Sequence, residues 1–126
     1  FIIALQYTAD LTRTVNFIVD SGSADMNTGL KGSLTLDVTG TIEHVQIMSD
    51  QIGSVQVDIK KSDYTSFPTS NSITNSQYIS ISNGQIVRDD TLNNWDNIIR
   101  SGDILQFEVI SVSNIRRFLI SLKLNL

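Results

Sequence analysis

The residue types that most often perform catalysis are sparse in this sequence of 126 residues. It has a single histidine, His44, and no cysteine, which excludes disulfides, thiolate metal sites and cysteine nucleophiles. A lone histidine makes a poor metal site, and no nucleophile-elbow sequence accompanies it, so we expect His44 to lie on a strand surface or to be partly packed. The sequence therefore predicts no catalytic residue, no metal site and no bound cofactor.

Paired carboxylates could cleave a glycosidic bond if they faced each other across a groove. The only glutamates are Glu43 and Glu108, and strand alternation directs both to outward faces. Asp96 lies within the helix-like window 91–100, and Asp103 follows a glycine at a strand start, where a short acid commonly caps a turn. The acidic segment 20–25 lacks the spaced ligands of a calcium loop and is expected to be a turn. We therefore expect solvated acids and caps rather than an enzymatic pair.

Aromatic side chains are of interest for sugar binding, because a flat ring can stack on the face of a sugar. Tyr64, Phe67 and Tyr78 flank a long polar segment near the middle of the chain and are the predicted ligand contacts. Of these, Tyr64 is the best candidate for an exposed ring. Trp95 shares an apolar stripe with neighbouring leucine and isoleucine residues, so a structural role in the core or at an interface is expected for it.

The basic residues are scattered, and the net charge is −4. Binding to nucleic acid would need a concentrated basic surface, so no nucleic-acid partner is expected. Arg116 and Arg117 are adjacent within a predicted strand and must point to opposite faces. We expect Arg117 to pair with a carboxylate, within the chain or across a subunit boundary, or to be an edge-strand charge that discourages aggregation.

Alternation of apolar and polar residues is the main signal of half-buried strands. It recurs in six runs, at 13–19, 33–39, 42–49, 54–60, 103–111 and 115–124. Turn residues at 51–53 are expected to separate the third run from the fourth. Asn83-Gly84 predicts a type I′ hairpin in which 78–82 pairs back on 85–87.

Two segments depart from strand patterning. The segment 62–77 holds the only proline, Pro68, with many Ser, Thr and Asn residues, and is predicted to be a long surface loop with a functional role. Between 91 and 100 apolar residues recur at helix spacing after Asp89 and Asp90, which predicts one short helix. No apolar run reaches the roughly 20 residues of a membrane span, so no membrane insertion is expected.

Short strands at regular spacing predict an antiparallel β-sandwich, jelly-roll-like, with about eight strands. We expect a single sandwich domain over residues 13–126, preceded by an N-terminal segment with the first strand over 1–20. The apolar residues 1–5 follow no initiator methionine, and we expect the chain to continue from an upstream stalk or anchor. Phe1 and Ile3 are accordingly candidate interface residues, to be buried against other copies or the stalk.

Two stretches of the sequence contain a series of short motifs whose order along the chain is characteristic. They contain Thr28-Gly29-Leu30-Lys31-Gly32, Ser49-Asp50-Gln51-Ile52-Gly53-Ser54 and Phe67-Pro68, then Leu92 with Trp95, Ser101-Gly102-Asp103-Ile104-Leu105, Arg117 and Ser121-Leu122-Lys123. With this order and spacing, residues 15 to 124 resemble a β-sandwich domain that recurs in virion proteins of tailed bacteriophages, in tail-fibre, baseplate and head-fibre proteins. Similar phage sequences usually have tryptophan where Lys60 stands.

The resemblance implies a place on the surface of the phage particle, a homotrimer, contact with other virion proteins and no catalytic residue. We therefore expect a non-enzymatic domain, the distal part of a trimeric tail or head fibre, that adheres to a host-surface polysaccharide. One alternative is a purely structural fibre-cap, baseplate or capsid-decoration domain without its own ligand. Others are a carbohydrate-binding module of a bacterial protein and a glycan-cleaving enzyme that uses Asp96 or Glu108.

Overall fold

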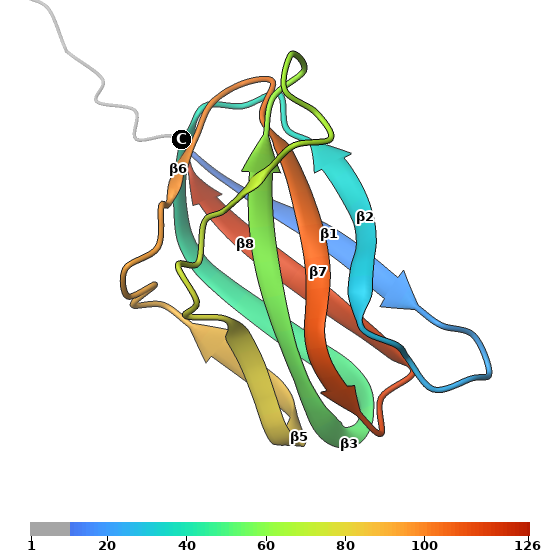
Figure 1. The fold of residues 1–126 in the computed structure, drawn as a ribbon. Coiled ribbons are helices and arrows are strands. Elements are labelled where there is room, and N and C mark those ends of the chain that lie inside the picture. The colour runs from blue at the N-terminus through green and yellow to red at the C-terminus, as the bar shows by residue number, and fades with distance from the viewer. Residues whose placement is uncertain (1–10) are drawn as a thin grey trace, which may run out of the picture.

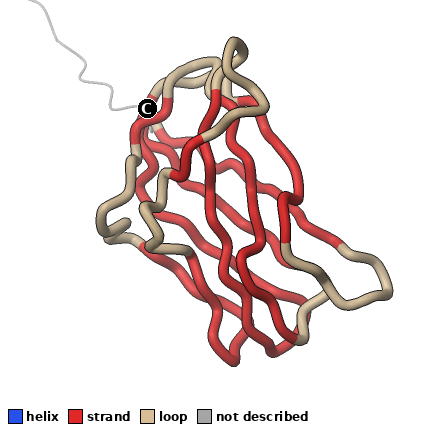
Figure 2. Tube along the Cα trace, viewed as in Figure 1, coloured by secondary structure: helices blue, strands red, loops and turns tan. Residues whose placement is uncertain are grey.

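The computed structural model describes residues 11–126, and the expected interface residues Phe1 and Ile3 lie outside that range (Figure 1). Its strands are β1 (Thr12–Asp20), β2 (Gly29–Thr35), β3 (Gly40–Ser62), β4 (Asn71–Ser72), β5 (Ile79–Asp89), β6 (Ile98–Ile99), β7 (Ile104–Ser113) and β8 (Arg117–Asn125). Over these residues the chain forms only strands, turns and loops (Figure 2). The all-β class and the eight antiparallel strands agree with the sequence prediction. No helix in this range could cross a bilayer.

The strands form one curled sheet that is organised around β3. The main path runs β1-β8-β3-β7-β2, and β4, β5 and β6 also pair with β3. The first part of β3 pairs with β8, from Thr41 to Ser49, and its second part pairs with β7, from Ser54 to Ser62. We call the two halves of the sheet the first wing (β1, β8 and the first part of β3) and the second wing (β2, β7 and the second part of β3).

Strand β5 follows β3 across both wings, and this overturns two of the predicted turns. Met48 pairs with Ile86 in the first wing and Val55 pairs with Ile81 in the second, with irregular register around Gly53 and Gly84. Residues 51–53 are therefore a bend inside one strand. Asn83-Gly84 is likewise a bend and not a hairpin, because only Asn83 adopts a positive φ, of 48°, whereas a type I′ turn needs two such residues.

The core lies between the wings, where the alternation of the strands directs the apolar side chains. The ring of Phe17 in β1 stacks on that of Phe107 in β7, with centroids 4.4 Å apart. Gly32 in β2 makes room for this contact, because a Cβ there would come within 2.7 Å of the Phe17 ring. One aromatic pair thus joins strands from opposite wings.

The short helix predicted for 91–100 does not form. Leu92 and Asn94 have positive φ angles of 47° and 65°, which α-helices exclude. Asp89 Oδ1 accepts the N–H groups of Thr91 and Leu92 at 3.0 Å, so the expected helix cap closes a turn instead. Leu92 and Trp95 are still buried. A loop that lies against the sheet can bury two apolar residues at this spacing as well as a helix can.

The two facing glycines of the bend differ sharply in the space around them. A Cβ on Gly53 would lie 2.5 Å from the Ser113 carbonyl oxygen and 2.7 Å from Ile115 Cγ1, whereas one on Gly84 would meet nothing closer than 3.7 Å. We expect Gly53→Ala to lower the free energy of unfolding by about 1–3 kcal/mol, as overpacking does. Gly84→Ala should change it by much less. Denaturant titration of both variants measures this, and equal losses would contradict the assignment.

Candidate ligand-binding site

A compact loop, residues 63–69, follows β3 and is held by its own polar groups. Asp63 Oδ1 accepts the N–H of Ser66 at 2.7 Å, and the Asp63 carbonyl oxygen accepts the N–H of Phe67 at 2.9 Å. Ser62 Oγ donates to the Thr69 carbonyl oxygen at 2.6 Å and ties the two ends of the loop together. Asp63 thus shapes this loop in the way that short acids commonly cap turns.

A second loop, residues 100–103, precedes β7 and has the same kind of brace. Asp103 Oδ2 accepts the N–H of Arg100 at 2.8 Å, and the Arg100 carbonyl oxygen accepts the N–H of Asp103 at 2.9 Å. Gly102 has a φ of 95°, which favours glycine. Its N–H donates to the Leu36 carbonyl oxygen at 2.7 Å, so the loop is fixed to the chain that follows β2.

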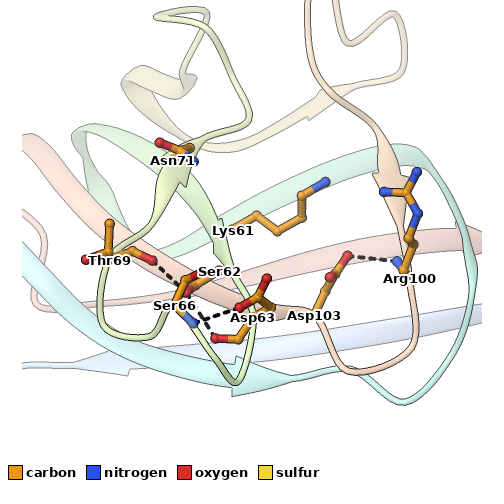
Figure 3. A pocket seen from close by; sticks show the side chains of 8 residues that line it. All are labelled: Lys61, Ser62, Asp63, Ser66, Thr69, Asn71, Arg100 and Asp103. Carbon is orange, nitrogen blue, oxygen red and sulfur yellow. Dashed lines mark hydrogen bonds between the residues drawn. The ribbon is translucent and has the colours of Figure 1, made fainter.

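Between these two loops lies a polar pocket of about 370 Å³ (Figure 3). It forms because Ser62 at the end of β3 pairs with Ile104 at the start of β7, which brings the loops together. The lining residues are Lys61, Ser62, Asp63, Ser66, Thr69, Asn71, Arg100 and Asp103. Two strand ends therefore position groups that are about 40 residues apart in the sequence.

Lys61 is held in place at one side of the pocket. Its Nζ lies 3.0 Å from Asp96 Oδ2 and 2.9 Å from the carbonyl oxygen of Ile98. The hydrogen bond from Lys61 is the main cause that lowers the pKa of Asp96, and the charge of Arg100 adds to it. The ammonium group of Lys61 is therefore already balanced by a carboxylate.

Several other polar groups of the pocket have no protein partner. Within residues 11–126, the guanidinium of Arg100 forms no hydrogen bond or ion pair. The carboxylates of Asp63 and Asp103 each use one oxygen for a loop N–H and leave the other one uncommitted. The side chain of Asn71 is also uncommitted among the described residues. The pocket thus presents donors and acceptors together.

The three predicted ligand contacts do not lie together. Tyr64 is 93% exposed and Phe67 is 44% exposed, and both belong to the loop 63–69, but neither is among the residues that line the pocket. Tyr78 is half-buried beside Lys60, whose pKa is raised chiefly by its bond to Glu108 and slightly by Tyr78, and it does not line the pocket.

The long loop predicted over 62–77 is in fact interrupted. Asn71 and Ser72 form β4 and pair with the end of β3, and Ile73 and Thr74 are buried. Sequence reasoning missed Arg100 as a member of the site. The glycine of Ser101-Gly102 is a residue that commonly marks a turn, but only the β3–β7 pairing places the loop 100–103 beside Asp63.

The remaining candidate residues have structural contacts. Trp95 is buried, and its indole N–H donates to the Gln77 carbonyl oxygen at 2.7 Å. Arg117 is exposed, with Nε 3.6 Å from Asp20 Oδ2 in the neighbouring strand. His44 is half-buried, and its Nδ1 has no hydrogen-bond partner. The two acids considered for catalysis each contact a lysine, Asp96 as above and Glu108 at 2.8 Å from Lys60 Nζ.

The acidic segment 20–25 forms a turn in which Asp20 Oδ1 accepts the N–H of Gly22 at 2.8 Å. Within residues 11–126, no three His, Cys, Asp or Glu side chains gather where they could hold a metal ion.

No family model matches the chain, and no curated protein matches its sequence. Solved structures are similar to it in fold. A carbohydrate-binding module from glycoside hydrolase family 9 (Cel9A) of Ruminococcus flavefaciens FD-1 has a TM-score of 0.51 at 16% identity, over 90% of this chain and 96% of that chain. The SPBc2 prophage-derived protein YomS has a TM-score of 0.49 at 12% identity, over 94% of this chain and 99% of that chain. At such identities the likeness concerns the fold alone.

The lowered pKa of Asp96 implies that the stability of the fold depends on pH in the acidic range. A carboxyl whose pKa is depressed by folding stabilises the fold above its ordinary pKa, near 4, and that contribution is lost as the pH falls through the lowered value. We expect Asp96→Asn to be slightly less stable than the parent at pH 7 and the gap to close below about pH 4. Urea titrations between pH 2 and 7 measure it, with Asp25→Asn as the control. A gap that does not change with pH would contradict the Lys61–Asp96 contact.

Proposed function

We propose that this chain is a non-enzymatic carbohydrate-binding domain and that the loop 63–69 carries the binding site. The observation that supports this most is Tyr64, whose side chain is 93% exposed and which directly follows Asp63, a residue that lines the polar pocket. A tyrosine ring left in water has much apolar area to gain from contact. A sugar unit offers an apolar ring face for that contact and hydroxyls for the polar groups nearby.

The fold and the acids also favour binding over catalysis. The structural neighbour from Cel9A is described as a carbohydrate-binding module, so a sheet of this shape can present a glycan site in another protein. Function resides in the site rather than the fold, and this support is accordingly general. Asp96 and Glu108 are engaged by Lys61 and Lys60, and these consecutive residues of β3 point to opposite faces of the sheet, which leaves no facing pair for hydrolysis.

The sequence resemblance supports a place for this domain in a phage virion. We propose that it is the distal part of a trimeric tail or head fibre and that its ligand is a host-surface glycan. The two wings with the core between them are then the two layers of a jelly-roll β-sandwich. Three copies would turn weak single sites into useful avidity. A carbohydrate-binding module of a bacterial protein would share this site and differ in its neighbouring domains.

A row of apolar side chains supports assembly with other copies, and it also favours the second candidate, a purely structural fibre or decoration domain. Ile18, Leu119, Met48 and Ile86 pair successively across β1, β8, β3 and β5 on the outer face of the first wing. Ile18 is 69% exposed and Ile86 is 60% exposed. Such contiguous apolar surface is typical of interaction sites.

We propose a second copy of this chain as the occupant of this apolar row. Charges of both signs border it, with Arg88 on one side and the Asp20–Arg117 pair on the other. Because the two borders differ in charge, the Arg88 border of one copy can meet the border with Asp20 of the next, and such head-to-tail contacts can close into a ring of three.

The contribution of the Tyr64 ring to binding can be tested by comparing its removal with a substitution that keeps the ring. We expect Tyr64→Ala to weaken binding to a glycan ligand about fivefold or more, as truncation of a central aromatic contact does. Tyr64→Phe keeps the ring and should retain most of the affinity. Screening on an array of bacterial polysaccharides followed by calorimetry measures both. Equal affinities for the parent and both variants would contradict the proposal that the loop 63–69 carries the binding site.

The apolar row makes a separate prediction about mass in solution. We expect light scattering to give a trimer for the parent chain and a monomer for Ile18→Lys combined with Ile86→Lys, because two buried charges without partners would cost several kcal/mol. Leu30→Lys, in the second wing, is the control and should leave the trimer intact. Parent protein that is a monodisperse monomer would remove the proposal.

A further inference from the structure

The charges that line the pocket between the two loops are of both signs. Lys61 and Arg100 are cationic, and Asp63 and Asp103 are anionic. Because Asp96 already balances Lys61, the groups left to meet a ligand are one guanidinium and two carboxylates. An acidic ligand would encounter both carboxylates, and a cationic ligand would encounter Arg100.

The uncommitted groups of the pocket match the chemistry of a hydroxyl. A hydroxyl donates one hydrogen bond and accepts others. The free carboxylate oxygens of Asp63 and Asp103 can only accept, and the guanidinium of Arg100 can only donate. Bonds in which one partner is charged are about twice as strong as neutral ones. A ligand with several neighbouring hydroxyls and no net charge would satisfy both kinds of group at once.

The two carboxylates are held in position before any ligand arrives. Asp63 is fixed by the N–H of Ser66 at 2.7 Å, and Asp103 is fixed by the N–H of Arg100 at 2.8 Å (Figure 3). The same acids that close the loops therefore keep their second oxygens uncommitted. Such preorganisation reduces the entropy that is lost when a ligand binds.

We infer that this pocket binds an uncharged sugar unit, with Asp63 and Asp103 accepting from its hydroxyls and Arg100 donating to them. The inference rests on the proposed glycan-binding function and narrows its ligand class. The cavity of about 370 Å³ is at the small end of ligand pockets, roughly 300–1,000 Å³, which suits one or two sugar units of a branch or chain end. Tyr64 would stack beside the pocket, on the same unit or on the next.

The test compares neutral and acidic members of one glycan panel. The immobilised polysaccharides and oligosaccharides are matched in pairs that differ by a uronic acid, phosphate or sialic acid group. We expect the intact chain to bind neutral members and to discriminate against their acidic partners. Asp63→Asn and Asp103→Asn each keep an oxygen for the loop N–H, and Arg100→Gln removes the guanidinium. Each should weaken binding roughly tenfold or more, as loss of a hydrogen bond to a charged group does.

Asp25→Asn and Arg116→Gln are matched controls and should retain full affinity, because they lie in the β1–β2 and β7–β8 connections and not among the residues that line the pocket. Thermal unfolding identifies any variant that does not fold. Preference for acidic members, or binding that depends on Tyr64 but not on the three pocket residues, would overturn the inference and leave glycan binding intact. Binding to no member of the panel would overturn both proposals.

Discussion

The continuity of β3 through the bend at its buried Gly53 is the constraint on which the rest of this structure depends. Gly53 sits against the Ser113 carbonyl oxygen with no space for a side chain, and the strand changes partner there from β8 to β7. Because one strand belongs to both wings, the apolar faces of β1 and β8 are turned toward those of β2 and β7. The stacked rings of Phe17 and Phe107 join the wings at one point of that core.

The candidate site is a consequence of where β3 ends. The strand delivers Lys61 and Ser62 to one end of the sheet, and its pairing with β7 holds the loop 100–103 next to the loop 63–69. Regular backbone hydrogen bonds therefore support a site whose ligand-facing groups lie on loops. Proteins commonly place their functional residues on loops that a rigid scaffold holds in position.

Two kinds of surface are left exposed by this arrangement, and they differ in chemistry. The pocket is polar, and the exposed ring of Tyr64 belongs to one of the two loops that form it, a combination that is suited to a hydroxylated ligand. The row from Ile18 to Ile86 is apolar and lies on the outer face of the first wing, which is suited to another protein surface. A domain with one surface for a ligand and another for its own copies would gain avidity through assembly, and a fibre that adheres to a polysaccharide needs this property.

Local patterning of the sequence was sufficient for the all-β class and for most strand positions, because side-chain alternation records which face of a strand is buried. The exposure of Tyr64 followed from its place in a polar segment, since such segments commonly form surface loops. It could not decide between a turn and a bend at 51–53 or at Asn83-Gly84, since both need the same permissive residues. The helix predicted over 91–100 failed for a similar reason, because burial of Leu92 and Trp95 requires only that they reach the core. Only the tertiary structure showed that Asp63, Arg100 and Asp103 line the same pocket, because the pairing of β3 with β7, and not sequence distance, makes them neighbours.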